Sequence, residues 1–203
     1  MLSAGSLPAE APGPRVPPDS STVARAYLLT GRPGVGKTTC LRKALDLLRV
    51  PAGGFVTREI RDRGARVGFD LLTLDGRRTT LAHAGRRSGP RVGKYRVDLE
   101  AVERVGVPAI LAATRRGHLV VIDEIGKMEM TAPAFRDAVD EILAGAGVVL
   151  GTILGSSHPW ADRIKARPGV RLIEVTPANR ESLPSDLARL VGAALRPDAG
   201  AEV

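Results

Sequence analysis

Residues 31–38 of this 203-residue chain carry the groups needed to hold a chain of phosphates. The stretch reads Gly-Arg-Pro-Gly-Val-Gly-Lys-Thr, a full match to the phosphate-loop pattern of glycine, four residues, glycine, lysine and serine or threonine. Glycines let consecutive backbone N–H groups converge on one phosphate, and Lys37 adds a compact cation. In such a loop the Thr38 hydroxyl binds Mg²⁺. The stretch therefore predicts a nucleotide site made by Gly31, Arg32, Pro33, Gly34, Val35, Gly36, Lys37, Thr38 and Thr39.

Two adjacent carboxylates, Asp123 and Glu124, follow the apolar run Leu-Val-Val-Ile at 119–122. A buried parallel strand delivers such residues at its carboxyl end, where open α/β sheets bind their ligands. Asp123 is therefore expected to hold Mg²⁺ opposite the hydroxyl of Thr38. Because neighbouring strand residues point to opposite faces, Glu124 takes a different role as the base or orienter of an attacking water. We predict Lys37 and Glu124 as catalytic residues, and both carboxylates as part of the nucleotide site.

Three further residues are candidates for contacts with a nucleotide. The loop 176–180 lies where phosphate-loop folds often bind the base, so Asn179 could hydrogen-bond a base edge and Arg180 could stack on the ring. Thr152 ends the apolar run 148–153, where it either senses the γ-phosphate or simply terminates a strand.

These residues need a sheet and helices to bring them together, and the hydrophobic pattern supplies both. The apolar runs 24–30, 119–122, 148–153 and 170–175 suit buried parallel strands. Leu41, Ala44, Leu45 and Leu48 recur at helical spacing directly after the phosphate loop. Strand, glycine-rich loop and helix is the arrangement that the loop needs.

The remaining elements are expected to surround this centre. Residues 55–60 and 66–74 flank the turn 61–64 and predict an antiparallel hairpin, because the connection is too short for a parallel crossover. Residues 99–105 and 108–114 predict two short helices divided by Gly106, with Asp98 capping the first. Thr131 is expected to cap a helix that has Pro133 in its first turn. Residues 160–167 and a segment around Leu187 predict two more helices.

The segment 85–96 is dense in arginine and glycine and predicts an exposed loop near the site. We therefore expect an α/β fold over residues 23–203, with a mostly parallel sheet between helices and an added antiparallel hairpin. Residues 1–22 are rich in Pro, Ala, Gly and Ser and predict a disordered arm.

Composition limits the classes of function. The formal charge of +8 suits polyanionic partners, so nucleic acid is possible, but it is not favoured because no dense basic run occurs. A single cysteine, Cys40, allows no intrachain disulfide and fits a reducing, cytoplasmic setting. No apolar stretch reaches the roughly 18 residues of a membrane span. The three histidines lack metal-ligand spacing. As a separate expectation, we predict a monomer or weak oligomer.

Taken together, the motifs resemble the cancer-related nucleoside-triphosphatase family, known in archaea and bacteria as the THEP-type nucleoside-triphosphatases. Beside the phosphate loop, the matching pieces are Gly-Phe-Val-Thr at 54–57, Arg-Val-Gly-Phe-Asp at 66–70, Arg-Val-Gly-Lys-Tyr-Arg-Val-Asp-Leu at 91–99, Asp-Glu-Ile-Gly-Lys-Met-Glu at 123–129, Gly-Thr-Ile at 151–153 and Val-Thr-Pro-Ala-Asn-Arg at 175–180. The phosphate loop is shared by very many proteins, whereas the stretches 91–95 and 123–129 are specific to this group.

The resemblance implies a three-layer P-loop NTPase fold and a Mg²⁺-dependent hydrolase. Such an enzyme accepts several nucleoside triphosphates (ATP, GTP, CTP and UTP) and releases the diphosphate and phosphate. The resemblance also implies phosphate binding by residues 31–38, metal binding by Thr38 and Asp123, and water activation by Glu124.

Two alternatives stay open. A kinase of the same fold would pass the γ-phosphate to a nucleoside or polynucleotide, with Arg86, Arg87 and Arg91 as lid arginines. A nucleotide-operated switch would use the positive charge to bind nucleic acid. Hydrolysis is preferred because Asp123 and Glu124 supply a water-activating acid and no acceptor pocket can be recognised in the sequence.

Overall fold

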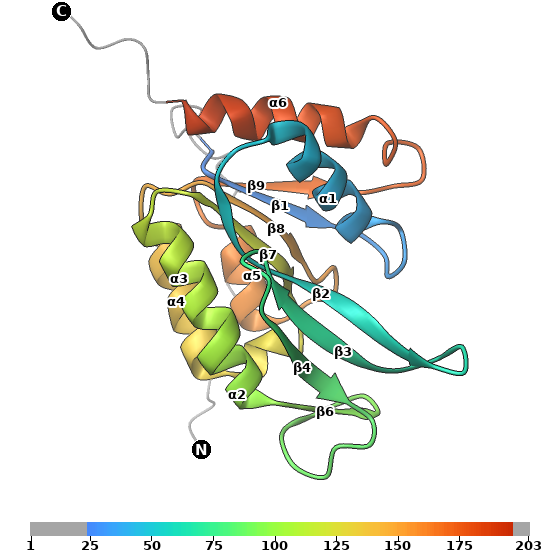
Figure 1. Cartoon of the computed structure of the whole chain (residues 1–203). Coiled ribbons are helices and arrows are strands. Elements are labelled where there is room, and N and C mark those ends of the chain that lie inside the picture. The colour runs from blue at the N-terminus through green and yellow to red at the C-terminus, as the bar shows by residue number, and fades with distance from the viewer. Residues whose placement is uncertain (1–23, 197–203) are drawn as a thin grey trace, which may run out of the picture.

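A nine-stranded mixed sheet forms the centre of the part of the chain that the computed structural model describes, residues 24–196 (Figure 1). The predicted arm at 1–22 lies outside these residues. The strand order is β5-β6-β4-β3-β2-β7-β8-β1-β9. In chain order the strands are β1 (Ala26–Thr30), β2 (Ala52–Asp62), β3 (Ala65–Thr73), β4 (Arg78–His83), β5 (Arg91–Val92), β6 (Tyr95–Val97), β7 (Leu119–Ile125), β8 (Val149–Ile153) and β9 (Val170–Glu174).

The parallel half of the sheet comprises β2, β7, β8, β1 and β9. Its central strands are almost wholly apolar and buried, as the runs in the sequence predict. Because parallel strands end at one edge, the residues that follow β1, β7 and β8 meet there. The predicted meeting of the phosphate loop with Asp123 is confirmed at the level of topology.

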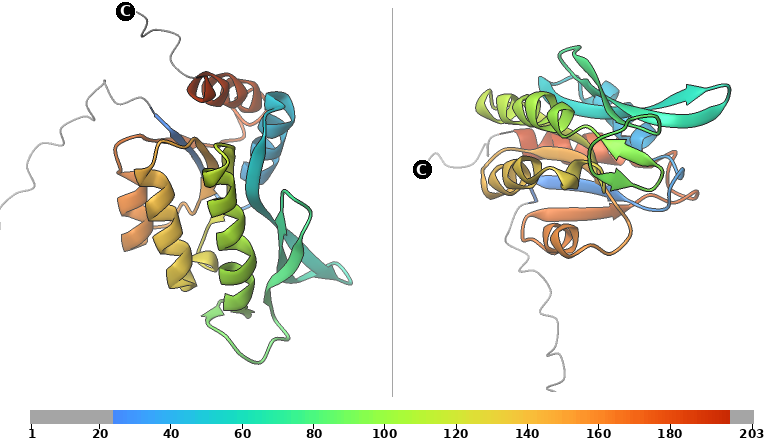
Figure 2. Two further views of the ribbon diagram at one scale, coloured as in Figure 1. Left: turned by 60° about the vertical axis from the view of Figure 1, so that its left-hand side comes forward. Right: turned by 90° about the horizontal axis from the view of Figure 1, so that it is seen from below.

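Helices cover both faces of this half and make three layers (Figure 2). One face carries α1 (Lys37–Leu48) and α6 (Leu183–Leu195), which pack on each other. The other carries α2 (Leu99–Ala101), η1 (Val102–Gly106), α3 (Val107–Arg115), η2 (Glu129–Thr131), α4 (Pro133–Ala144) and α5 (Pro159–Lys165). Each face has its own buried apolar cluster, and the expected α/β sandwich is therefore confirmed.

The predicted hairpin is present and is part of the same sheet. The first five residues of β2 pair in parallel with β7, and the strand then runs on to pair with β3 in antiparallel register. The expectation of a plain exposed loop at 85–96 is wrong in part, because β5 and β6 lie within it and Tyr95 is buried. Of these short strands, β6 pairs with β4, a strand that the sequence pattern did not reveal, and β5 pairs with β6.

Two helix boundaries also differ from prediction. Residues 99–115 form one continuous helical run, with a single π-helical turn up to Gly106 rather than a break there. A Cβ at Gly106 would lie 3.1 Å from Leu71 Cδ1, so the glycine allows close packing on the sheet. The Asp98 cap is confirmed by its bond from the Glu100 amide, whereas Thr131 does not cap α4 and instead donates to the Met128 carbonyl.

Candidate functional site

The candidate site is a cleft of about 1160 Å³ along the carboxyl edge of the sheet. At one end it is lined by the loop between β1 and α1, which contributes Gly31, Arg32, Pro33, Gly34, Gly36, Lys37, Thr38 and Thr39. The middle is lined by Glu124 and Gly126, and the far end by the hairpin strands. The predicted phosphate loop and the predicted water-activating acid therefore share one cavity.

The phosphate loop has the backbone that its glycines allow. Gly31, Gly34 and Gly36 have φ values of 137°, 76° and 110°, a region that side chains with a Cβ rarely adopt. A Cβ on Gly31 would lie only 2.7 Å from the Val175 carbonyl oxygen. No side chain caps the start of α1, so its first N–H groups and the positive end of the helix dipole can face an anion.

Lys37 lies at the start of α1 with its side chain turned back over the loop. Its Nζ donates to the Gly31 carbonyl at 3.2 Å. The ammonium thereby stands beside the ring of loop amides, in the position where it can add charge to a bound phosphate.

Asp123 connects the loop to the neighbouring strands. It is 1% exposed, and its Oδ1 accepts hydrogen bonds from Thr38 Oγ1 at 3.2 Å and from Thr152 Oγ1 at 2.6 Å. Burial raises the pKa of this carboxyl, while the two hydroxyls lower it. Its Oδ2 is buried and has no hydrogen-bond partner among residues 24–196. A buried, unpartnered carboxylate oxygen beside the loop hydroxyl fits a hard cation such as Mg²⁺.

A metal ion here would have few protein ligands. Within the described part of the chain, no three His, Cys, Asp or Glu residues gather into a ligand set. Mg²⁺ usually keeps several waters and is shared with phosphates, so one carboxylate and one hydroxyl agree with its habits.

Glu124 lines the cleft together with the phosphate loop. The pairing of β7 with β8 is interrupted between Ile122 and Ile125, so both acids lie outside that ladder, although Asp123 still pairs with Val56 of β2. Burial raises the pKa of the Glu124 carboxyl, and the charge of Lys37 opposes that shift. Because β8 lies between β7 and β1, the acid stands about 10 Å, two strand spacings, from the loop strand.

The structure adds Glu129, an acid to which the sequence assigned no role. It is 4% exposed and lines the cleft, and burial raises its pKa to about 8, so the carboxyl is largely protonated at neutral pH. A Cβ on Gly126 would lie 2.8 Å from both Glu124 Oε1 and Glu129 Oε2, so these oxygens are within about twice that distance of each other. An acid placed between Met128 and Met130 was the available signal.

The predicted base contacts lie beside the cleft rather than in its wall. Asn179 Oδ1 accepts from the Thr176 amide at 2.8 Å, and its Nδ2 donates to the Glu174 carbonyl at 2.9 Å. These bonds shape the loop after β9 and leave the second Nδ2 hydrogen for a ligand. Arg180 is exposed and lies 3.5 Å from Glu181. Their contact with a base stays a prediction.

The arginines of the kinase alternative lie elsewhere. None of Arg86, Arg87 and Arg91 lines the cleft, and Arg86 forms an ion pair with Asp98 at 2.7 Å. The cations other than Lys37 that line the cleft are Arg32, Arg42, Arg58, Arg66 and Lys127.

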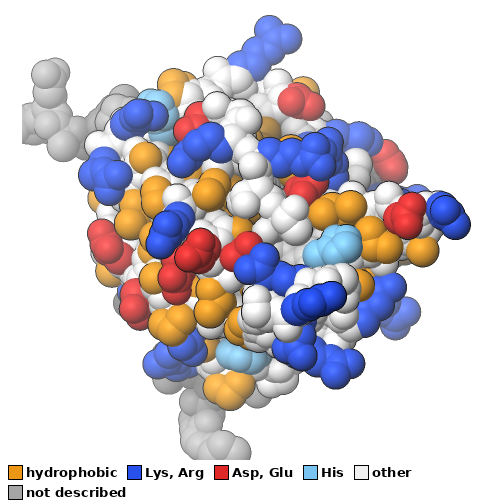
Figure 3. Space-filling model, turned by 60° about the horizontal axis from the view of Figure 1, so that its bottom comes forward, with side chains coloured by type: hydrophobic (Ala, Val, Ile, Leu, Met, Phe, Trp, Pro, Cys, Tyr) orange, Lys and Arg blue, Asp and Glu red, His pale blue; other side chains and the backbone are white. Residues whose placement is uncertain are grey.

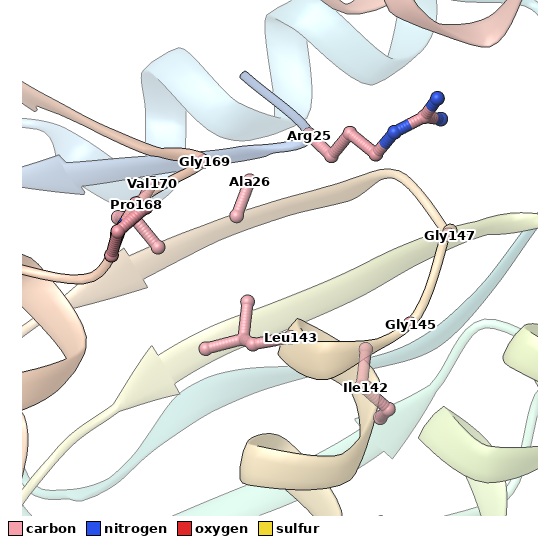
Figure 4. Close-up of a pocket in the computed structure, with 9 residues that line it drawn as sticks. All are labelled: Arg25, Ala26, Ile142, Leu143, Gly145, Gly147, Pro168, Gly169 and Val170. Carbon is pink, nitrogen blue, oxygen red and sulfur yellow. The ribbon is translucent and has the colours of Figure 1, made fainter. Parts of the chain in front are cut away.

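A second cavity, of about 170 Å³, lies at the amino ends of the strands (Figure 4). Its lining is apolar except for Arg25, whose guanidinium donates to the Ala146 carbonyl at 2.9 Å. No acid or nucleophile is among its lining residues, so this cavity offers no groups for catalysis.

Comparison with known proteins agrees with the geometry. The family model described as NTPase matches residues 26–188. The chain is 47% identical to nucleoside-triphosphatase THEP1 of Thermotoga petrophila, over 77% of this chain and 87% of that protein. It is 50% identical to the THEP1 of Thermofilum pendens, over 82% of this chain and 94% of that protein.

A solved structure is similar as well. The crystal structure of THEP1 from the hyperthermophile Aquifex aeolicus superposes with a TM-score of 0.75 at 36% identity, covering 82% of this chain and 98% of that one. The match to the family model, residues 26–188, includes the phosphate loop, the acids of β7 and the hairpin. The chain therefore belongs to the THEP1 and cancer-related nucleoside-triphosphatase family of phosphate-loop proteins.

Proposed function

We propose that this protein is a Mg²⁺-dependent hydrolase of nucleoside 5′-triphosphates that accepts ATP, GTP, CTP and UTP and releases the diphosphate and phosphate. The names of its relatives support a nucleoside-triphosphatase. The observation that carries the proposal is the carboxylate pair at the end of β7, with Asp123 hydrogen-bonded to the phosphate-loop hydroxyl and Glu124 open to the cleft.

The phosphate loop holds the substrate by its backbone. The loop amides and the start of α1 bind the β-phosphate, and Lys37 moves from the Gly31 carbonyl to the β- and γ-phosphates. Thr38 and Asp123 would hold Mg²⁺, which neutralises charge on the β- and γ-phosphate oxygens when it is bound. Most of the rate enhancement then comes from position and charge.

Glu124 acts on the water. Its carboxylate accepts a proton as the water oxygen bonds to the γ-phosphorus, and the bond from that phosphorus to the β,γ-bridging oxygen breaks. The proton then leaves with the phosphate product or with solvent. Few side chains of the cleft are aimed at a base, which supports broad base specificity, since a site that grips phosphates discriminates weakly among bases.

The test is phosphate release from the four triphosphates with and without Mg²⁺, in the wild type and in Glu124→Gln. We expect release from all four with Mg²⁺, and a fall in kcat of about 10² to 10⁴, or about 3 to 5 kcal/mol, in the variant. Nucleotide binding should persist. The matched control is Glu141→Gln, an exposed residue of α4 that does not line the cleft. Wild-type turnover in Glu124→Gln would refute the assignment.

A further inference from the structure

Beyond Glu124, the cleft continues into a part that hydrolysis does not use. Its wall comes from β2, β3 and β5 and from the segment after β7, with Arg58, Arg66, Phe69, Val92, Lys127 and Met128. We call this part the hairpin subsite. Two of its strands come from the stretches 66–70 and 91–99, which have no task in the hydrolysis proposed above.

The nucleoside of the substrate cannot fill the hairpin subsite. The strand order places β7 between the loop strand β1 and the hairpin strand β3, about 10 Å, or two strand spacings, from each. In the proposed hydrolysis, on which this inference rests, the γ-phosphate lies beside Glu124 and the β-phosphate in the loop. The nucleoside must then extend away from Glu124, toward the other end of the cleft. The cleft volume of about 1160 Å³ exceeds the roughly 300 to 1000 Å³ of common ligand pockets.

The planar guanidinium of Arg66 has a fixed orientation within this wall. Its Nη1 donates to Glu59 Oε1 at 2.8 Å and its Nε to the Tyr95 hydroxyl at 3.1 Å. Its guanidinium lies over the Phe69 ring at 5.2 Å from the ring centre, and Tyr95 packs edge-on against that ring. The Arg66 side chain remains 47% exposed. A planar guanidinium fixed in this way can stack on the ring of a ligand.

The rest of the subsite combines apolar and cationic groups. Val92 and Met128 are partly buried hydrophobic residues that pack against the same apolar cluster as Phe69. Arg58 contacts its cross-strand neighbour Asp70 at 3.9 Å, so its side chain lies on the opposite face of the hairpin from Glu59, Arg66 and Phe69. Lys127 is an exposed cation of this wall. On the face shown in Figure 3, many Lys and Arg side chains are spread among hydrophobic and acidic ones.

We propose that the hairpin subsite binds a second ligand of the nucleoside 5′-monophosphate class while the triphosphate occupies the phosphate loop. The base stacks on Arg66 and rests on the apolar side chains of Val92 and Met128. The phosphate is bound by Lys127, whose ammonium suits an anion better than a neutral ring. Glu59, already paired with Arg66 and Arg61, can accept hydrogen bonds from a base or a ribose.

The test measures binding to the loaded protein. The full chain is saturated with the β,γ-imido analogue of ATP and Mg²⁺, and AMP, GMP, CMP and UMP are titrated by calorimetry, with adenosine and inorganic phosphate as half-ligands. We expect at least one monophosphate to bind with one site per chain, and each half-ligand to bind at least about tenfold more weakly.

Two variants locate the binding. Val92→Trp fills the subsite and Arg66→Gln removes the stacking plane, and each should weaken monophosphate binding at least about tenfold. Leu74→Trp is the control, since Leu74 is 39% exposed and does not line the cleft. Affinity for the triphosphate analogue reports whether each variant is folded.

Three outcomes would overturn the proposal. These are no binding of any monophosphate to the loaded protein at millimolar concentration, unchanged binding in both variants, or displacement of the analogue by the monophosphate, which would place the second ligand in the phosphate loop. Failure of the proposed hydrolysis is distinguishable, because it appears as absent phosphate release whether or not monophosphates bind.

Discussion

Thr152→Val tests whether Asp123 is the carboxylate that binds the metal, and whether its hydrogen-bond donors fix its orientation. Thr152 is fully buried, and its hydroxyl makes the shorter of the two side-chain hydrogen bonds to Asp123 Oδ1, 2.6 Å against 3.2 Å from Thr38. Valine keeps the β-branched shape and suits a strand. The substitution therefore removes one donor and little else, leaving Asp123 with Thr38 as its remaining side-chain donor within residues 24–196.

Two quantities should change, by amounts that follow from these contacts. A hydrogen bond to a charged group contributes about 1.5 to 3 kcal/mol, and the valine methyl recovers part of that loss. We expect the free energy of unfolding to fall by about 1 to 2 kcal/mol. Loss of a partner that orients a metal-binding carboxylate typically costs about 10- to 100-fold in metal affinity or activity, so the Mg²⁺ midpoint of phosphate release should rise by that factor.

The assay pairs a Mg²⁺ titration of phosphate release with urea unfolding. Thr114→Val is the matched control. The Thr114 hydroxyl also donates a partly buried hydrogen bond, to the Ile110 carbonyl at 3.0 Å, but Thr114 lies in α3 outside the cleft. The control should leave the Mg²⁺ midpoint unchanged. A midpoint within about twofold of wild type in Thr152→Val would refute the assignment of Asp123, since orientation by a neighbour would then not matter.

Three other substitutions test separate parts of the molecule. Lys37→Met should lower kcat/KM by about 10² to 10³, through loss of the cation at the γ-phosphate, and equal phosphate release in variant and wild type would contradict this. Glu129→Gln addresses a carboxyl whose folded pKa of about 8 lies above its ordinary 4.5, so that the folded state favours the proton and its stability falls as pH rises between these values. Relative to wild type, the variant should gain up to about 1.4 kcal/mol of unfolding free energy per pH unit across that window in urea titrations, and a pH-independent difference would oppose it. Gly54→Ala should cost at least about 2 kcal/mol in thermal or urea unfolding, because Gly54 has φ 111° and a Cβ there would overlap the Val121 carbonyl; wild-type stability would show that the backbone can adjust.

The parallel half of the fold could be predicted because its signals are local. Its buried strands are unbroken apolar runs, and the phosphate loop carries its own glycines. At the other end of the sheet, β5 and β6 are only two and three residues long, β4 begins with Arg-Thr-Thr, and all three are stabilised by pairing with β3 and with one another. At Gly106 the sequence predicted a break between two helices. The helical run continues there, because the glycine allows close packing on the sheet.

The same division holds for the site. Residues 31–38 and Asp123 could be proposed from the sequence because each lies in a short local pattern, the phosphate-loop motif and an apolar run that ends in acids. The burial of Glu129 beside Glu124 depends on the tertiary path of the segment after β7, which no residue pattern in the sequence indicates. The wall formed by Arg66 and Phe69 depends on the register of β3 against β2, which pairs Glu59 with Phe69.

The position of β8 explains why a hydrolase can be built on this sheet. If β7 lay directly beside β1, Glu124 would stand about one strand spacing, near 5 Å, from the loop strand, too close for a γ-phosphate and a water at about 3 to 3.5 Å from it. Inserting β8 doubles that distance. Two residues of β8 contact β7 closely. Gly151 allows the strands to approach, because a Cβ there would come within 2.7 Å of the Ile122 carbonyl oxygen. The hydroxyl of Thr152 donates a hydrogen bond to Asp123. In the proposed mechanism, β8 thus both gives the water its space beside Glu124 and orients Asp123, the carboxylate proposed to bind the metal.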